Sequence, residues 1–267
     1  MAADRFLEVR GLGKAYGGER WPRRQAEHWA LRNVSFELAR GETLGVVGAS
    51  GSGKSTLARC LALMETPTAG EILFEGRSLA KPSRRETLEL RGQVQLIPQQ
   101  PAASLNPRFT AEEIIAEPLV LLERASGDAR AKRVRELMEL CGLKVAAARN
   151  RALEFSGGER QRLAVARALA ADPALLILDE SLAGLDLSVQ AQVVNLLLGL
   201  QPRRGLTYIV VSHDLSVVGN IADRLLVLDG GEAVEQGDAE ALLSHPAHAR
   251  TRELVAAAAT LAYGRSA

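Results

Sequence analysis

The sequence predicts an α/β fold with a mainly parallel sheet, and two patterns support that prediction. Short continuous apolar runs at residues 43–47 and 174–178 are typical of strands that are buried on both faces of a parallel sheet. Helical periodicity follows such runs, with Val189, Val193 and Leu197 on one helix face. Strands that alternate with helices imply parallel strands joined by crossover helices.

The first part of the chain contains two strand-like runs, at residues 6–10 and 34–39. Between them, residues 17–30 are rich in Arg and show no alternation, so we expect an irregular insert there. After the next buried strand come a glycine-rich loop, a helix over residues 55–64 and a strand over residues 70–76.

The middle of the chain, from about residue 100 to residue 160, is expected to form an α-helical subdomain inserted in the α/β domain. Within it, Val134, Leu137, Met138 and Cys141 have the i, i+3, i+4, i+7 spacing of one helix face. A plain surface excursion is the alternative that this pattern leaves open.

The last part continues the alternation with a helix over residues 157–171 and a strand over residues 208–212. A hairpin is predicted over residues 225–236, with its turn at Asp229-Gly230-Gly231. We therefore expect one domain over residues 1–237 and a C-terminal helical extension over residues 238–267.

The composition is ordinary for a globular protein, with 47% hydrophobic and 24% charged residues. Lys and Arg number 33 against 32 Asp and Glu, so the net charge of +1 gives no reason to expect a nucleic-acid partner. Cys60 and Cys141 have no metal-type spacing and are predicted to be core residues. No apolar run reaches the roughly 18 residues that a membrane-spanning helix needs, so we expect that the chain itself does not cross a membrane.

A glycine-rich motif between a predicted strand and a predicted helix carries the first functional signal. It fits the pattern G-x-x-x-x-G-K-[ST] with Gly48, Ala49, Ser50, Gly51, Ser52, Gly53, Lys54, Ser55 and Thr56. Glycines let backbone N–H groups approach phosphates, and the helix N-terminus adds the positive end of its dipole. Lys54 can reach the β- and γ-phosphates of ATP, and Ser55 can offer its hydroxyl to Mg²⁺.

Polar residues follow two of the predicted buried strands. Asp179 and Glu180 end one strand, at the sheet edge where ligands of open α/β sheets bind. Asp179 is predicted to hold Mg²⁺ through its water shell, and Glu180 to act as general base on the attacking water or to orient it. His213 ends another strand and is a candidate γ-phosphate contact, although a lone histidine is more often structural.

A second anion-binding signal lies at Ser156, Gly157 and Gly158, which open a predicted helix. With residues 155–162 (FSGGERQR) in view, the sequence resembles the ATP-binding-cassette (ABC) ATPases. An ordinary helix N-cap by Ser156 is the alternative for this segment.

The resemblance covers nearly the whole chain and implies a P-loop NTPase (RecA-like) fold. In that family the core carries an N-terminal antiparallel β subdomain and an inserted α-helical subdomain. The Ser156–Gly158 segment completes the ATP site of a partner subunit in a head-to-tail dimer.

Single residues also match positions of the family. Tyr16 matches the aromatic that stacks on adenine, with Trp29 as a rival. Gln99 matches the loop glutamine that senses Mg²⁺ and the membrane subunit. Asp186 matches the end of the loop that crosses the dimer, and His213 matches the switch histidine.

Finer features are similar to the ATPases of dipeptide, oligopeptide and nickel importers, such as residues 104–108 (SLNPR) and 212–218 (SHDLSVV). This branch implies a homodimer or heterodimer of ATPases on the cytoplasmic face of the bacterial inner membrane. Integral membrane permease subunits and an extracytoplasmic solute-binding protein complete such systems. The alternative is a soluble ABC ATPase that drives no transport, such as a subunit of the phosphonate C–P lyase complex.

The sequence departs from this branch beside two of the expected site residues. Pro98 and Gln100 flank the loop glutamine where the branch usually has an aromatic residue and Asp or Asn. After Glu180, residues 181–184 are Ser-Leu-Ala-Gly instead of Pro-Thr-Ser-Ala. Neither departure removes a catalytic group, but both bear on the coupling between membrane subunit and ATP site.

Overall fold

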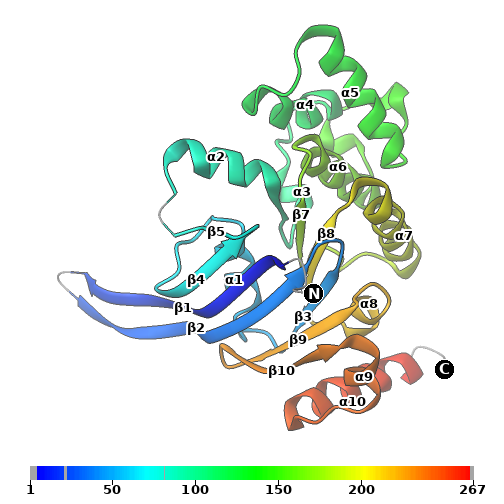
Figure 1. Ribbon diagram of the computed structural model, residues 1–267. Helices are drawn as coiled ribbons and strands as arrows, with labels where there is room; N and C mark the ends of the chain where they lie inside the picture. Colours follow the sequence, from blue (N-terminus) through cyan, green and yellow to red (C-terminus); the bar gives the residue numbers. More distant parts are fainter. Residues whose placement is uncertain (1–4, 21–22, 81, 265–267) are drawn as a thin grey trace. The chain divides into compact units, whose positions relative to one another are not determined.

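A computed structural model of the protein describes residues 5–20, 23–80 and 82–264. The chain divides into two compact units, Met1–Pro82 with Thr207–Ala267, and Ser83–Leu206, and each unit is described by itself. Figure 1 shows their helices and strands.

The first unit contains an antiparallel sheet in the strand order β2-β1-β4-β5. Its strands are β1 (Arg5–Arg20), β2 (Arg23–Ala39), β4 (Ala69–Phe74) and β5 (Arg77–Ser78). Phe6 of β1 packs edge-on against Phe74 of β4, with ring centroids 5.0 Å apart, in the apolar layer under this sheet. The predicted N-terminal antiparallel β region is therefore confirmed.

The expectation of an irregular insert over residues 17–30 is wrong where that segment is described. β1 and β2 form a long hairpin, clearly visible in Figure 1, and pair as far as Arg20 with Arg23. Ladder hydrogen bonds need no apolar alternation, and several shifts of register along the hairpin break the period of two on which the prediction relied.

The first unit also contains the strand order β10-β9-β3-β8, in which β3 runs parallel to β8 and to β9. The strands are β3 (Thr43–Val47), β8 (Thr207–Ser212), β9 (Arg224–Asp229) and β10 (Glu232–Asp238). The helices of this unit are α1 (Lys54–Leu61), α8 (Leu215–Gly219), α9 (Ala239–Ser244) and α10 (Ala249–Gly264). β3 and β8 are buried along their whole lengths, as the continuous apolar runs predicted.

The C-terminal helix α10 is held at its start by a carboxylate of β10. Glu235 accepts hydrogen bonds from the backbone N–H groups of Ala247, at 2.8 Å, and His248, at 3.1 Å. Arg250 in the first turn of α10 also forms an ion pair with Asp229 at the end of β9. Helices α9 and α10 thus follow β10, while the expected division at residue 237 into a domain and an extension stays a prediction.

The second unit combines a parallel strand pair with helices. β6 (Val94–Ile97) runs parallel to β7 (Leu175–Asp179). The helices are α2 (Arg84–Gln93), α3 (Pro101–Ser104), α4 (Ala111–Leu121), α5 (Gly127–Leu140), α6 (Gly157–Ala170) and α7 (Leu187–Arg204), with short 3₁₀ turns η1 (Val145–Ala147) and η2 (Ala152–Glu154). Both units thus contain parallel strands with helices, which confirms the predicted fold class.

The core contains the residues that helical spacing predicted to lie on one buried helix face. Val134, Leu137, Met138 and Cys141, along α5 and at its end, are all buried. Cys60 is buried as well, and both cysteines are free. In the part of the chain that the structure describes, no helix combines the length and the apolar character needed to cross a bilayer.

Candidate active site

The glycine-rich loop follows β3 directly, and two of its glycines have no room for a side chain. Gly48 has a φ of 155°, and a Cβ there would lie 2.2 Å from the carbonyl oxygen of Leu228. Gly53 has a φ of 102°, and a Cβ there would lie 2.4 Å from the carbonyl oxygen of Ala30. The loop therefore lies against the backbone of β9 on one side and of β2 on the other, and only glycine fits at these positions.

The side chains of this loop are polar and largely buried. The Lys54 ammonium donates hydrogen bonds to the carbonyl oxygens of Gly48 and Ala49, both at 2.8 Å. Ser52 is buried, and its Oγ has no hydrogen-bond partner among the residues that the structure describes. A buried hydroxyl without a partner is costly, so Ser52 is a group that a ligand oxygen could satisfy.

The position of the loop is fixed from behind by the turn between β9 and β10. Gly231 donates its N–H to the carbonyl oxygen of Ser52 at 3.2 Å and accepts a hydrogen bond from the N–H of Arg32 at 2.7 Å. These backbone contacts hold the loop between two strands, and its glycine N–H groups can bind phosphate without rearrangement.

Tyr16 is linked to the helix that follows the loop. Its hydroxyl donates a hydrogen bond to Glu65, which also accepts one from Arg59 on α1 at 2.7 Å. Arg59 in turn reaches the hydroxyl of Thr56 at 3.4 Å. Tyr16 is 37% exposed, and the Lys14 ammonium lies over its ring, 5.2 Å from the centroid, so its stacking on adenine stays a prediction.

Trp29, the rival for the stacking role, packs on the neighbouring strand. Its ring reaches to within 2.9 Å of the point where a Cβ on Gly13 would lie. Gly13 thus leaves space that the indole fills, which favours a packing role for Trp29.

The network around Glu65 was not found from the sequence. Burial alone would raise the pKa of Glu65, but the hydrogen bonds from Tyr16 and Arg59 outweigh it and lower the pKa below its usual value. Tyr16 and Glu65 are 49 positions apart, and no motif connects them.

His213 lies just beyond the end of β8 in the first unit, and it is exposed. The next residue, Asp214, caps α8 by accepting a hydrogen bond from the N–H of Ser216 at 3.0 Å. The strand end expected for His213 is present, while its contact with a γ-phosphate stays a prediction.

In the second unit the structure brings together two predicted residues that are far apart in sequence. The Gln99 amide nitrogen lies 2.9 Å from a carboxylate oxygen of Glu180. Glu180 has a φ of 47°, uncommon for a residue with a side chain, and it follows the buried Asp179 at the end of β7. Gln99 and Glu180 are thus brought together as neighbours, while their catalytic and Mg²⁺-binding roles stay predictions.

The Ser156 segment is both a helix cap and an open surface. Ser156 accepts a hydrogen bond from the N–H of Glu159 at 3.3 Å, and Glu159 accepts from the Ser156 N–H at 2.9 Å. This backbone hydrogen bond, with one from the Ser156 hydroxyl, lowers the pKa of Glu159. The N-cap alternative is thus present, yet the first-turn N–H groups of Gly157 and Gly158 have no partner within the helix and remain able to bind an anion.

The two glycines of this segment differ in their surroundings. A Cβ on Gly157 would meet nothing within 4 Å, whereas a Cβ on Gly158 would lie 2.5 Å from Cγ1 of Val189 on α7. Gly158 therefore permits the close approach of α6 to α7, and Gly157 leaves an open face.

Asp186 caps the next helix, α7. It accepts hydrogen bonds from the Ser188 hydroxyl at 2.7 Å and from the N–H of Val189 at 2.9 Å, and these lower its pKa. Its predicted nucleotide contact in a dimer stays a prediction.

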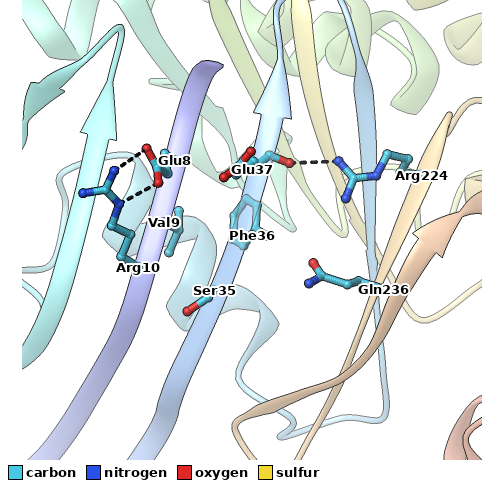
Figure 2. Close-up of a pocket in the computed structure, with 8 residues that line it drawn as sticks. All are labelled: Glu8, Val9, Arg10, Ser35, Phe36, Glu37, Arg224 and Gln236. Carbon is cyan, nitrogen blue, oxygen red and sulfur yellow. Dashed lines mark hydrogen bonds and ion pairs between the residues drawn. The ribbon is translucent and has the colours of Figure 1, made fainter. Parts of the chain in front are cut away.

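A surface hollow, shown in Figure 2, is lined by residues of β1, β2, β9 and β10, and none of the predicted site residues is among the lining residues that the structure describes. Its charged groups already have partners: Glu8 binds Arg10 through both carboxylate oxygens, and Arg224 donates to the backbone oxygen of Glu37 at 3.1 Å. We therefore assign it no part in the site.

The predicted Mg²⁺ ligands are chemically suitable. Ser55 in the first unit and Gln99 and Asp179 in the second offer a hydroxyl, an amide oxygen and a carboxylate, the oxygen donors that Mg²⁺ prefers. The described residues contain no cluster of three or more His, Cys, Asp or Glu that could hold a metal alone.

The chain is similar to known proteins over most of its length. The family model described as ABC transporter matches residues 31–183. The oligopeptide transport ATP-binding protein OppF of Bacillus subtilis is 46% identical over 230 residues, 85% of this chain and 75% of that protein. The dipeptide transport ATP-binding protein DppF of Haemophilus influenzae is 43% identical over 228 residues, 85% of this chain and 70% of that protein. A dimeric post-hydrolysis state of the ATP-binding cassette MJ0796 bound to ADP and Pi matches with a TM-score of 0.77 and 29% identity, covering 87% of this chain and 98% of that one.

Proposed function

This chain belongs to the ABC transporter family, and we propose that it is the ATP-hydrolysing subunit of a peptide importer whose membrane-spanning subunits are separate chains. The observation that carries the ATPase assignment is the loop after β3, where glycines, Lys54 and the unpartnered Ser52 hydroxyl line a cradle for phosphates. The relatives named for oligopeptide and dipeptide transport support the importer assignment over a soluble ATPase complex, and they favour peptides over nickel as cargo.

In the proposed reaction the chain first binds the phosphates of ATP. Lys54 exchanges its two carbonyl partners for phosphate oxygens, and Ser52 donates its buried hydroxyl. Residues Ser55, Gln99 and Asp179 would hold Mg²⁺, which neutralises charge on the phosphates when bound. Tyr16 stacks on the adenine.

Glu180 then orients the attacking water and accepts its proton, and this is worth about 10²–10⁴ in rate. Gln99 holds the Glu180 carboxylate through the hydrogen bond of 2.9 Å. His213 contacts the γ-phosphate from the end of β8. Because hydrolysis needs little covalent chemistry from the protein, the positioning of these groups accounts for most of the rate acceleration.

A second subunit completes each site. The open face at Gly157 and the N–H groups of Gly157 and Gly158 bind the γ-phosphate of ATP held by the other subunit. Asp186, at the start of α7, contacts the same interface. The partner is a second copy of this chain or a related ATPase, and the dimer of MJ0796 supports this arrangement.

The assembled system contains, in addition, integral membrane permease subunits and an extracytoplasmic solute-binding protein. The ATPase then lies peripherally on the cytoplasmic face of the inner membrane. The relatives are named for transport and for ATP binding, which supports an ATPase that works with membrane subunits.

Substitution of Glu180 by Gln tests the catalytic assignment. The variant should bind ATP and form a more stable dimer, because it keeps the site but lacks the group that accepts the proton. Steady-state hydrolysis should fall by at least about 10²-fold. Glu136→Gln is the matched control, since Glu136 pairs with Arg133 along α5, and this variant should keep its activity. Undiminished hydrolysis in Glu180→Gln would remove Glu180 from its role.

Isolation of the tagged chain from its native membrane tests the importer assignment. Integral membrane subunits should co-purify, and hydrolysis by the isolated assembly should rise when a solute-binding protein loaded with a short peptide is added. Co-purification of a soluble enzyme complex instead would establish the alternative, and stimulation by nickel alone would change the cargo.

A further inference from the structure

A part-buried arginine on α6 contacts the segment that carries Gln99. The Arg167 guanidinium donates a hydrogen bond to the carbonyl oxygen of Ser104 at 2.9 Å, across 63 residues of sequence. Ser104 is the last residue of α3, the single turn that begins shortly after Gln99. A cation at the C-terminal end of a helix is favoured both by the hydrogen bond and by the local dipole.

This contact is made in a setting where a charge is costly. Burial lowers the pKa of Arg167, which is partly compensated by the attraction of Glu117 on α4. Arg167 stays charged at neutral pH because arginine is effectively always protonated. A charged group kept in this environment, with a backbone oxygen as its hydrogen-bond partner, holds that backbone in place.

The segment between Gln99 and Ser104 is short, so a fixed Ser104 limits where Gln99 can lie. Pro101 is the first residue of α3, and Ser104 donates its hydroxyl to the Pro101 carbonyl oxygen at 2.7 Å. Pro98 immediately precedes Gln99. The two prolines fix φ at residues 98 and 101, and the φ and ψ angles of Gln99 and Gln100 stay free.

The other end of α6 begins at the segment that we assign to the partner's ATP. The same helix therefore carries Ser156 and Gly157 at its start and Arg167 three turns later. A helix transmits displacement as a rigid body over this length.

We propose that Arg167 is a positioning residue that couples the loop bearing Gln99 to the helix that begins at Ser156. This inference rests on the proposed function and deepens it. When a partner's nucleotide draws the start of α6, Arg167 keeps α3 with the helix and so maintains the contact of Gln99 with Glu180 that the structure shows. Because its hydrogen bond goes to the segment that carries Gln99, Arg167 acts through Gln99.

A double-mutant cycle on the purified full chain tests this coupling, with steady-state ATP hydrolysis, its Mg²⁺ dependence and the melting temperature as readouts. Arg167→Met should lower kcat about tenfold and raise the Mg²⁺ concentration needed for half-maximal activity. In a Gln99→Ala background the same substitution should have no further effect on kcat, because the side chain that Arg167 positions is absent. Arg167→Lys, which can still donate to Ser104, should restore most of the activity.

Arg162→Met is the control on the same helix. Arg162 donates to Gln192 on α7 at 3.1 Å instead of to α3, so its effect on kcat should add to that of Gln99→Ala. Additive effects of Arg167→Met and Gln99→Ala on kcat would overturn the proposal. It would also be overturned if kcat fell in proportion to the melting temperature, and to the same extent, in Arg167→Met and Arg162→Met. If Arg167→Met does not fold, the cycle is run with Arg167→Lys and its smaller effect is judged by the same criterion.

A Lys54→Ala variant distinguishes a failure of the proposed ATPase function from a failure of the proposed role of Arg167. If hydrolysis by the wild-type chain does not depend on Lys54, the proposed function is wrong and the coupling falls with it. If hydrolysis depends on Lys54 and Glu180 but the cycle is additive, only the role of Arg167 is wrong.

Discussion

Gly157→Ala should separate stability from activity, because the structure gives this position open space in the isolated chain. A Cβ there meets nothing within 4 Å, and alanine is preferred over glycine in a helix by about 0.5–1 kcal/mol. For a chain of this size, that gain is expected to raise the melting temperature by about 1–4 °C. Loss of function without loss of stability would mark a surface used by another molecule.

The expected loss of activity follows from the dimer that we propose. If the face of Gly157 closes on a partner's phosphates, one added methyl overpacks that contact at a cost of about 1–3 kcal/mol. This corresponds to a decrease of between about 5-fold and 150-fold in the apparent affinity for the closed state. Steady-state hydrolysis as a function of protein concentration measures it, with calorimetric melting of the same samples.

Gly158→Ala is the matched comparison one residue further on. Here a Cβ would lie 2.5 Å from Cγ1 of Val189, so the variant should melt at a lower temperature than the wild type. Adding Val189→Ala should recover much of that loss by removing the clash. Full hydrolysis in Gly157→Ala would refute the second anion site and leave Ser156 as a helix cap only.

Three further predictions concern single side chains. Ser52→Ala should leave the melting temperature unchanged or higher, because Oγ has no partner to lose, and should weaken ATP binding measured by titration calorimetry. Glu65→Gln should lower the melting temperature at pH 6–8. Because the pKa of Glu65 is lowered in the folded protein, its carboxylate contributes its full stabilisation above the ordinary pKa of 4.5 and loses it as the pH falls through the folded pKa. The difference in melting temperature between variant and wild type should therefore shrink near pH 3. Cys141, whose pKa burial raises to about 12, should resist alkylation at pH 8 in the folded protein and react once unfolded, as followed by mass spectrometry.

The sequence predicted those parts of the site that a local motif encodes. The glycine loop, the strand that ends at Asp179 and the cap at Ser156 each depend on residues within a few positions of one another, so spacing alone identified them. The buried strands were predicted for a similar reason. A short continuous apolar run such as residues 43–47 is typical of a strand in the interior of a parallel sheet.

What the sequence could not predict depends on contacts between distant segments. The hydrogen bond from Arg167 to Ser104 and the network of Tyr16, Glu65 and Arg59 join residues whose types are common and whose separations follow no period. The hairpin of β1 and β2 was missed because it is formed by cross-strand pairing. Such pairing produces no clear hydrophobic alternation in the sequence of either strand when neither face of the sheet has to be wholly apolar.

The two-residue turn between β9 and β10 limits how the length of this chain can vary among related proteins. Its second residue, Gly231, is bonded to Ser52 on one side and to Arg32 on the other, and its φ is 87°. One inserted residue would move that N–H away from the phosphate loop. Relatives should therefore keep the length of the β9–β10 turn constant, which an alignment of many family members can check.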